Sequence, residues 1–112
     1  MNKPLVSVII PTFNRPDILQ KTISNVLNQT WENLQVLVID DGNSKKNKEA
    51  IQSIVDDRLI YKKTNIRLGC AKARIEGIKY SKGEYITFID DDDNWNNNFI
   101  THQYQVFQEK PS

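Results

Sequence analysis

The sequence predicts an α/β fold in which a mainly parallel sheet carries helices on both faces. Short apolar runs rich in β-branched residues occupy residues 5–10, 34–39 and 85–89, and a weaker run covers residues 59–61. The three stronger runs are nearly continuous, as expected for strands that are buried on both faces. Amphipathic segments separate the runs and follow the last one. Strands that alternate with helices in this way are typical of a parallel sheet.

The first half of the chain predicts two strand–helix units. The run at residues 5–10 is followed by Pro16, which is well suited to the first position of a helix. The inward positions expected for that helix are Leu19, Ile23, Val26 and Leu27. After the run at residues 34–39, Ser44 can cap a second helix. Its expected inward positions are Ala50, Ile51, Ile54 and Val55.

The second half repeats the pattern. Charged residues flank the run at 59–61, so we expect this strand near an edge of the sheet. A third helix is indicated by apolar residues at three- and four-residue spacing, namely Leu68, Ala71, Ile75 and Ile78. Gly83 lies just past that helix, and the run at residues 85–89 follows. Beyond Trp95, a last apolar stripe is formed by Ile100, Tyr104 and Phe107.

Composition narrows the possible functions. Fifteen Lys and Arg residues against fourteen Asp and Glu residues leave a net charge of +1, which argues against a general nucleic-acid binder. Cys70 and His102 are the single cysteine and histidine, so an internal disulfide and a cysteine zinc site are excluded. Any metal site must therefore use oxygen ligands, and we interpret both residues as structural. We find no domain boundary within residues 1–112 and no targeting segment, and we expect a cytoplasmic protein.

Polar and acidic turns follow three of the predicted strands. They cover residues 11–15, 40–44 and 90–95, and the last contains four consecutive aspartates at residues 90–93. Right-handed crossovers bring the carboxyl ends of parallel strands to one edge, where α/β proteins bind ligands. Carboxylates about 5 Å apart repel by roughly 1 kcal/mol in water. A divalent cation such as Mg²⁺ or Mn²⁺ would relieve this repulsion. The alternative is a solvated acidic loop that caps the last helix.

Two further side chains have both a functional and an ordinary interpretation. Phe13 follows a strand directly, where an aromatic residue usually belongs to the core, but at a ligand-binding edge it could stack on a nucleobase. Arg74 lies on the helix before the last strand and could meet a phosphate or remain a solvated cation. The turn that contains Asp41 also consists of ordinary turn-forming residues.

Taken together, these segments resemble the N-terminal half of family 2 glycosyltransferases, which have the GT-A fold. The resemblance covers residues 4 to about 108. The matching pieces are residues 6–15, 29–31, 38–44, 83–86 and 88–95, together with Asn65, Gly69, Ala73, Arg74 and Gly77. We therefore expect a Rossmann-like sheet with strand order 3-2-1-4. Residues 1–112 would form the donor-binding part of a longer glycosyltransferase domain.

The resemblance implies transfer of a sugar from a nucleotide-diphosphate sugar, often UDP-linked, to an acceptor hydroxyl group with inversion. The acceptor would be a saccharide or a lipid-linked saccharide in polysaccharide biosynthesis, at the inner face of the membrane in the full-length protein. By position, the residues expected to border the donor are Pro11, Thr12, Phe13, Asn14, Asp41, Arg74 and Asp91. Asp90 and Asp92 would hold Mn²⁺ or Mg²⁺ as part of the family's DxD motif. The general base is expected beyond Ser112, so these residues alone would bind the donor without transferring its sugar.

Two alternatives remain open from the sequence. The chain could be a non-catalytic nucleotide-sugar-binding module. It could also be a receiver domain in which residues 36–41 supply the acidic pocket and Asp90 is the phosphoacceptor. In receivers, however, the aspartate pair follows the first strand, whereas here a strand–helix unit precedes it. We also expect a homodimer, formed through apolar surface and a strand edge left exposed at residues 85–89.

Overall fold

The computed structural model describes residues 3–42 and 45–109. Strands and helices alternate along the described chain, as predicted. The elements are β1 (Val6–Thr12), α1 (Pro16–Leu27), β2 (Leu34–Asp40), α2 (Lys45–Gln52), β3 (Leu59–Lys63), α3 (Cys70–Tyr80), β4 (Tyr85–Phe88) and α4 (Phe99–Glu109). Helix α1 begins at Pro16, which confirms the start signal in the sequence. The cap expected at Ser44 lies outside the described residues.

The four strands form one parallel sheet in the order β3-β2-β1-β4, which confirms the predicted order. Strand β1 is central, so Val8 lies opposite Val36 on one side and opposite Thr87 on the other. The order reverses between β1 and β4, and this is where open α/β sheets bind ligands. A receiver domain has the strand order 2-1-3-4-5 instead. The receiver alternative is therefore wrong.

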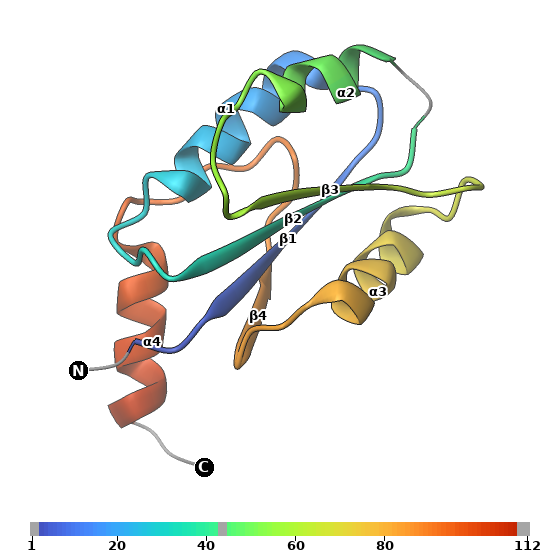
Figure 1. Cartoon of the computed structure of the whole chain (residues 1–112). Coiled ribbons are helices and arrows are strands. Elements are labelled where there is room, and N and C mark those ends of the chain that lie inside the picture. The colour runs from blue at the N-terminus through green and yellow to red at the C-terminus, as the bar shows by residue number, and fades with distance from the viewer. Residues whose placement is uncertain (1–2, 43–44, 110–112) are drawn as a thin grey trace.

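Helices cover the sheet on both faces, with α1 and α2 on one side and α3 on the other (Figure 1). Every residue of β1 and β2 is buried, as the continuous apolar runs predicted. The larger core lies on the α1 face, where Leu19, Ile23 and Val26 pack against alternate residues of the central strands. The smaller core joins Ile9, Leu37, Ile39 and Ala73 under α3. The central strands are thus held from both sides.

Two predicted helix faces need correction. Helix α2 ends at Gln52, so Val55 lies beyond it and is 97% exposed instead of pointing inward. In α3 the buried residues are Ala73 and Gly77, whereas Ile75 and Ile78 are 55% and 44% exposed. Gly77 explains the difference, because a β-carbon at this position would lie 2.4 Å from Cγ2 of Ile9. The helix backbone therefore lies close to the sheet and presents small side chains to it.

Strand β4 is less buried than its sequence predicted. Ile86 and Phe88 are 41% and 39% exposed, so the expectation of burial on both faces is wrong. The cause is its position at the edge of the sheet, where β1 is its one partner strand within residues 3–42 and 45–109.

Helix α4 lies beside the start of β1 (Figure 1), and its Tyr104 and Phe107 rings contact the Tyr85 ring of β4. There the Tyr104 ring lies 4.7 Å from the ring of Trp31 and 5.7 Å from that of Tyr85, measured between centroids. Within the described residues, no helix is both long and apolar enough to cross a membrane.

Candidate functional site

A cavity of about 380 Å³ opens at the carboxyl edge of the sheet. Its walls come from the turns after β1, β2 and β4 and from the start of α3. The lining residues are Pro11, Thr12, Phe13, Arg15, Asp41, Arg67, Cys70, Ala73, Arg74, Asp90, Asp91 and Asp92. The structure therefore brings together every predicted site residue except Asn14. The expectation that the polar and acidic turns share one edge is confirmed.

Asn14 has a different position from the one we expected. Its φ of 52° places it in the left-handed region, which asparagine tolerates better than most residues and which turns the chain toward α1. Its side-chain oxygen packs against Gly42, where a β-carbon would lie 2.2 Å from that oxygen. Asn14 therefore fixes the β1 turn against the β2 turn instead of lining the cavity.

The two adjacent aspartates at the end of β2 have different environments. Asp40 is fully buried and accepts hydrogen bonds from the Gly42 backbone N–H at 3.0 Å and the Tyr61 hydroxyl at 2.7 Å. The Asn47 amide also donates to it at 3.4 Å. Burial and the bond to Asp40 raise the pKa of Tyr61, so its hydroxyl stays a donor. Asp40 thus stabilises the turn after β2 from within the core. Of the two aspartates, Asp41 is the one that lines the cavity.

The Asp41 carboxylate is held by three hydrogen-bond donors and one ion pair. Oδ1 accepts from the Thr64 hydroxyl at 2.9 Å and the Leu68 backbone N–H at 2.7 Å. Oδ2 accepts from the Gly69 backbone N–H at 2.8 Å and forms an ion pair with Arg67, whose Nε lies 2.9 Å away. Burial alone would raise the pKa of Asp41, but these bonds and the Arg67 charge together lower it below its ordinary value. Asp41 is therefore ionised at neutral pH.

Arg67 and Phe13 form a stacked pair at the same end of the cavity. The guanidinium carbon lies 3.5 Å from the centroid of the Phe13 ring, within the range of a cation–π contact. Phe13 is 41% exposed, so it is not a core residue. This part of the cavity combines an accessible aromatic ring with a cation and a buried carboxylate.

The acidic turn lies at the other end and is paired with arginines. Nη2 of Arg74 lies 2.7 Å from Oδ1 of Asp90. Nη1 of Arg15 lies 3.1 Å from Oδ2 of Asp92 and 3.5 Å from Oδ1 of Asp91. The remaining oxygen of Asp91 accepts from the Thr12 hydroxyl at 2.8 Å. Each of the three carboxylates therefore has a partner within the chain.

Asp93 is not part of this arrangement, and its Oδ1 accepts from the Asn94 backbone N–H at 2.8 Å. It does not line the cavity. Of the four consecutive aspartates, three face the cavity, and the fourth orders the turn toward α4.

The aspartates suit a metal ion only together with a ligand. No group of three or more potential metal ligands is arranged to hold an ion in the described part of the chain. However, Asp90 and Asp92 each use one oxygen for an arginine, and the other oxygen of each has no hydrogen-bond partner among the described residues. Mg²⁺ is commonly bound through one or two carboxylates plus substrate phosphates. The donor set therefore fits a hard divalent cation that shares its shell with a phosphate group.

Sequence reasoning missed four lining residues, namely Arg15, Arg67, Cys70 and Ala73. Arg15 lies in the turn after β1, and its place in that turn was a usable signal. No sequence signal marked Arg67, because its position depends on how the segment before α3 folds back onto Asp41. Cys70 and His102 are both exposed, so burial does not support our interpretation of them as structural residues.

Comparison with known proteins places this architecture in a family. Residues 7–112 match Glycosyl transferase family 2, and the chain belongs to that family. A similar sequence is the Escherichia coli protein named UDP-Glc:alpha-D-GlcNAc-diphosphoundecaprenol beta-1,3-glucosyltransferase WfaP. It is 37% identical over 104 residues, which are 93% of this chain and 41% of that protein. The chain spans about two fifths of the length of the curated relatives it matches first.

Solved structures share the fold. Staphylococcus aureus TarS 1–349 in complex with UDP-GlcNAc has a TM-score of 0.85 and 22% identity, over 93% of this chain and 31% of that one. A mannosyltransferase from Pyrobaculum calidifontis in complex with GDP-Man and Mn²⁺ has a TM-score of 0.83 and 22% identity, over 98% and 34% of the two chains. These likenesses show that the sheet and its helices belong to the glycosyltransferase fold.

Proposed function

We propose that this chain is the donor-binding part of a glycosyltransferase that moves a sugar from a UDP-sugar to an acceptor hydroxyl group with inversion. One observation carries the proposal. A single cavity has an accessible aromatic ring and a carboxylate at one end, and arginines and aspartates at the other. A nucleotide-diphosphate sugar has matching parts, because it joins a flat base to a charged diphosphate.

The aromatic end is suited to the base. A nucleobase stacked on the exposed ring of Phe13 would gain about 1–3 kcal/mol. Pro11 and Thr12 form the adjoining wall, at the end of β1. We assign the nucleoside to this end, which leaves the diphosphate near α3 and the acidic turn.

The charged end is suited to the diphosphate and a divalent ion. Arg15 and Arg74 are half-exposed or nearly so, and their ion pairs are weak enough to be exchanged for phosphate oxygens. Asp90 and Asp92 would hold Mn²⁺ or Mg²⁺, with Asp91 beside the donor's ribose or sugar. When bound, the ion would offset the negative charge that develops on the departing diphosphate.

The proposal also includes an acceptor and a general base that deprotonates its hydroxyl group. We propose that the general base lies outside these 112 residues. The name of the Escherichia coli relative specifies a lipid-linked acceptor. A saccharide or lipid-linked acceptor in polysaccharide biosynthesis is therefore our proposal for the whole protein, acting at the inner face of the membrane.

Calorimetric titration of the purified protein with UDP, with and without Mn²⁺, tests the donor and metal assignments. Asp92→Asn keeps the side-chain shape and removes one charge, so UDP affinity in Mn²⁺ should fall about tenfold or more. Asp93→Asn is the matched control, because Asp93 does not line the cavity, and it should change little. Asp41→Ala should weaken UDP binding while leaving the binding of Mn²⁺ alone in place. Equal UDP affinity in the wild type and Asp92→Asn at saturating Mn²⁺ would overturn the metal assignment.

A sugar-transfer assay on the full-length protein separates catalysis from binding. Turnover that is lost in Asp92→Asn and kept in Asp93→Asn supports a glycosyltransferase. Donor binding without turnover on any acceptor would instead support the non-catalytic binding module.

A further inference from the structure

We infer that Thr22 and Asn25, on α1, are positioning residues for the acidic turn and set how tightly its aspartates hold a divalent ion. This inference rests on the proposed donor and metal site. Neither side chain lines the cavity, and neither was among the predicted site residues. Both would act through the backbone of the segment that carries Asp90 and Asp92.

The first step concerns the backbone of residues 89–98, all of which the structure describes. This segment joins β4 to α4 and forms neither a helix nor a strand. Within the acidic turn, the Asp93 N–H donates to the Asp90 carbonyl oxygen at 3.1 Å. Other buried backbone groups of the segment need partners from another element. Helix α1 lies alongside the segment and supplies several of them (Figure 1).

The second step concerns two amide side chains, Asn25 on α1 and Gln29 just past its end. The Asn25 amide donates to the Trp95 carbonyl oxygen at 2.8 Å, and its side-chain oxygen accepts from the Trp95 N–H at 2.8 Å. Gln29 donates to the Asn96 carbonyl oxygen at 2.8 Å and accepts from the Ile100 N–H at 3.2 Å. These four bonds fix the path of the chain from the acidic turn to α4.

The third step concerns Thr22, whose hydroxyl reaches the turn itself. Thr22 is buried, and its hydroxyl donates to the Asp91 carbonyl oxygen at 2.6 Å. The same hydroxyl lies 3.3 Å from the Asp93 carbonyl oxygen and 3.2 Å from the Ile18 carbonyl oxygen of its own helix. A hydroxyl carries one proton, so the shortest contact makes Asp91 its main acceptor. Thr22 thus contacts the residues on both sides of Asp92.

The fourth step connects this support to the aspartates that face the cavity. The side chains of Asp90 and Asp92 are 55% and 56% exposed, and each is paired with one partly exposed arginine. Exposed ion pairs of this kind hold a side chain only weakly. The direction of the two carboxylates is then set mainly by the backbone, which Thr22 and Asn25 hold in place. Removing a group that orients metal ligands commonly lowers metal affinity by about 10- to 100-fold.

Calorimetric titration with UDP, with and without Mn²⁺, tests the inference. Thr22→Val keeps the side-chain shape and removes the hydroxyl donor. We expect this variant to lose about tenfold in UDP affinity in Mn²⁺ and to keep the wild-type affinity for UDP alone. Thr22→Ser keeps the donor and should keep the affinity in Mn²⁺. Asn25→Ala removes both bonds to Trp95 and should behave like Thr22→Val, so it provides the test if the valine variant does not fold.

Ile23→Val is the matched control for stability. Ile23 follows Thr22 on the same helix and is buried in the core, so its loss of a methylene group should lower the urea midpoint of unfolding. It should keep the wild-type gain in UDP affinity from Mn²⁺. An unchanged gain in Thr22→Val or Asn25→Ala, or an equal loss of the gain in Ile23→Val, would overturn the positioning role and leave the donor site standing. A wild type that does not bind UDP, or gains nothing from Mn²⁺, would overturn the proposed donor and metal site itself.

Discussion

At the scale of single residues, Thr12 and Asp91 connect the central strand to the acidic turn. Both are buried, and the Thr12 hydroxyl donates to Oδ2 of Asp91 at 2.8 Å. Thr12→Val keeps the shape and leaves a buried carboxylate oxygen without this donor. We expect a loss of about 1–3 kcal/mol in the free energy of unfolding, measured by urea denaturation. Thr12→Ser keeps the hydroxyl and is the control. A valine variant as stable as the serine variant would show that the bond contributes nothing.

The sequence predicted those site residues whose place depends only on strand order. Phe13, Asp41 and Asp92 each follow a strand, and parallel strands bring those turns to one edge. Arg67 could not be placed in this way. It reaches the cavity because the Leu68 and Gly69 backbone groups bond to Asp41. Such a contact between a loop and a distant carboxylate leaves no periodic signal in the sequence.

At the scale of elements, Arg58 ties the start of β3 to the end of α1. Its guanidinium donates to the Leu27 and Glu32 carbonyl oxygens at 3.1 Å and 3.0 Å. Nη2 also pairs with Asp56 at 2.9 Å. The bonds from the Arg58 side chain and backbone lower the pKa of Asp56 to about 2. The Arg58–Asp56 ion pair in this connection therefore weakens when acid protonates Asp56.

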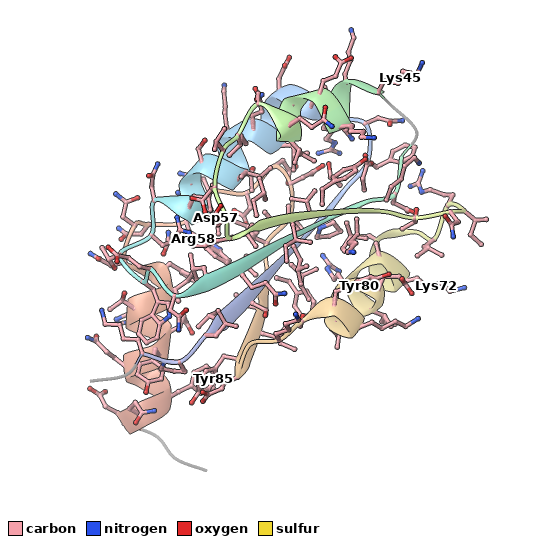
Figure 2. The ribbon with its side chains drawn as sticks, in the orientation of Figure 1. Lys45, Asp57, Arg58, Lys72, Tyr80 and Tyr85 are labelled. Atoms are coloured by element: carbon pink, nitrogen blue, oxygen red, sulfur yellow. The ribbon has the colours of Figure 1, made fainter. Side chains whose placement is uncertain are left out.

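The sign of that sensitivity follows from the pKa. Because the folded-state pKa is about 2 and the ordinary value is 3.8, Asp56 stabilises the fold above about pH 4 and loses this contribution as the pH falls toward 2. Asp56→Asn should remove a pH-dependent component on the order of 1 kcal/mol, measured by urea unfolding across this range. Asp57→Asn is the control, because this neighbouring side chain is exposed (Figure 2). An identical pH profile for wild type and Asp56→Asn would contradict the assignment.

The contact between α3 and the sheet gives a second prediction at this scale. Alanine is a better helix former than glycine by about 1 kcal/mol, so Gly77→Ala would stabilise an exposed helix. Here the new β-carbon meets Ile9, and we expect a net loss of about 1–3 kcal/mol in thermal or urea unfolding. The Ile9→Ala background removes the clash, and there the same substitution should cost less. Equal costs in the two backgrounds would argue against this contact.

The elements themselves were predictable to different degrees. Strands β1 and β2 and helix α1 follow from continuous apolar runs and from Pro16, because burial on both faces demands such sequences. The inward face of α3 was missed, because a helix that lies close to a sheet selects small residues such as Gly77 over large apolar ones. Such a close approach depends on the partner strand, and the helix sequence alone does not report it.

At the scale of the whole molecule, the β4 edge and α4 form an apolar surface. Tyr85, Ile86, Phe99, Tyr104 and Phe107 line a groove of about 220 Å³ there. Exposed strand edges next to apolar side chains favour association. We predict that the chain of 112 residues forms dimers or larger species in light scattering, and that Ile86→Glu shifts it toward monomer. A monomer at high protein concentration would rule out association through this surface.

The close packing of Gly77 against Ile9 also affects how a genetic screen for loss of the proposed sugar transfer would be interpreted. Arg74 lies one turn before Gly77 on the same helix, and it lines the cavity although Gly77 does not. Alleles that enlarge residue 77 would shift this helix and move the Arg74 guanidinium. Their phenotype would therefore resemble that of substitutions in the cavity itself. Suppressor mutations should then arise at Ile9, on the sheet. Recovery of such suppressors would show that the defect arises from packing between α3 and the sheet. It would also show that Gly77 is not a substrate-contacting residue.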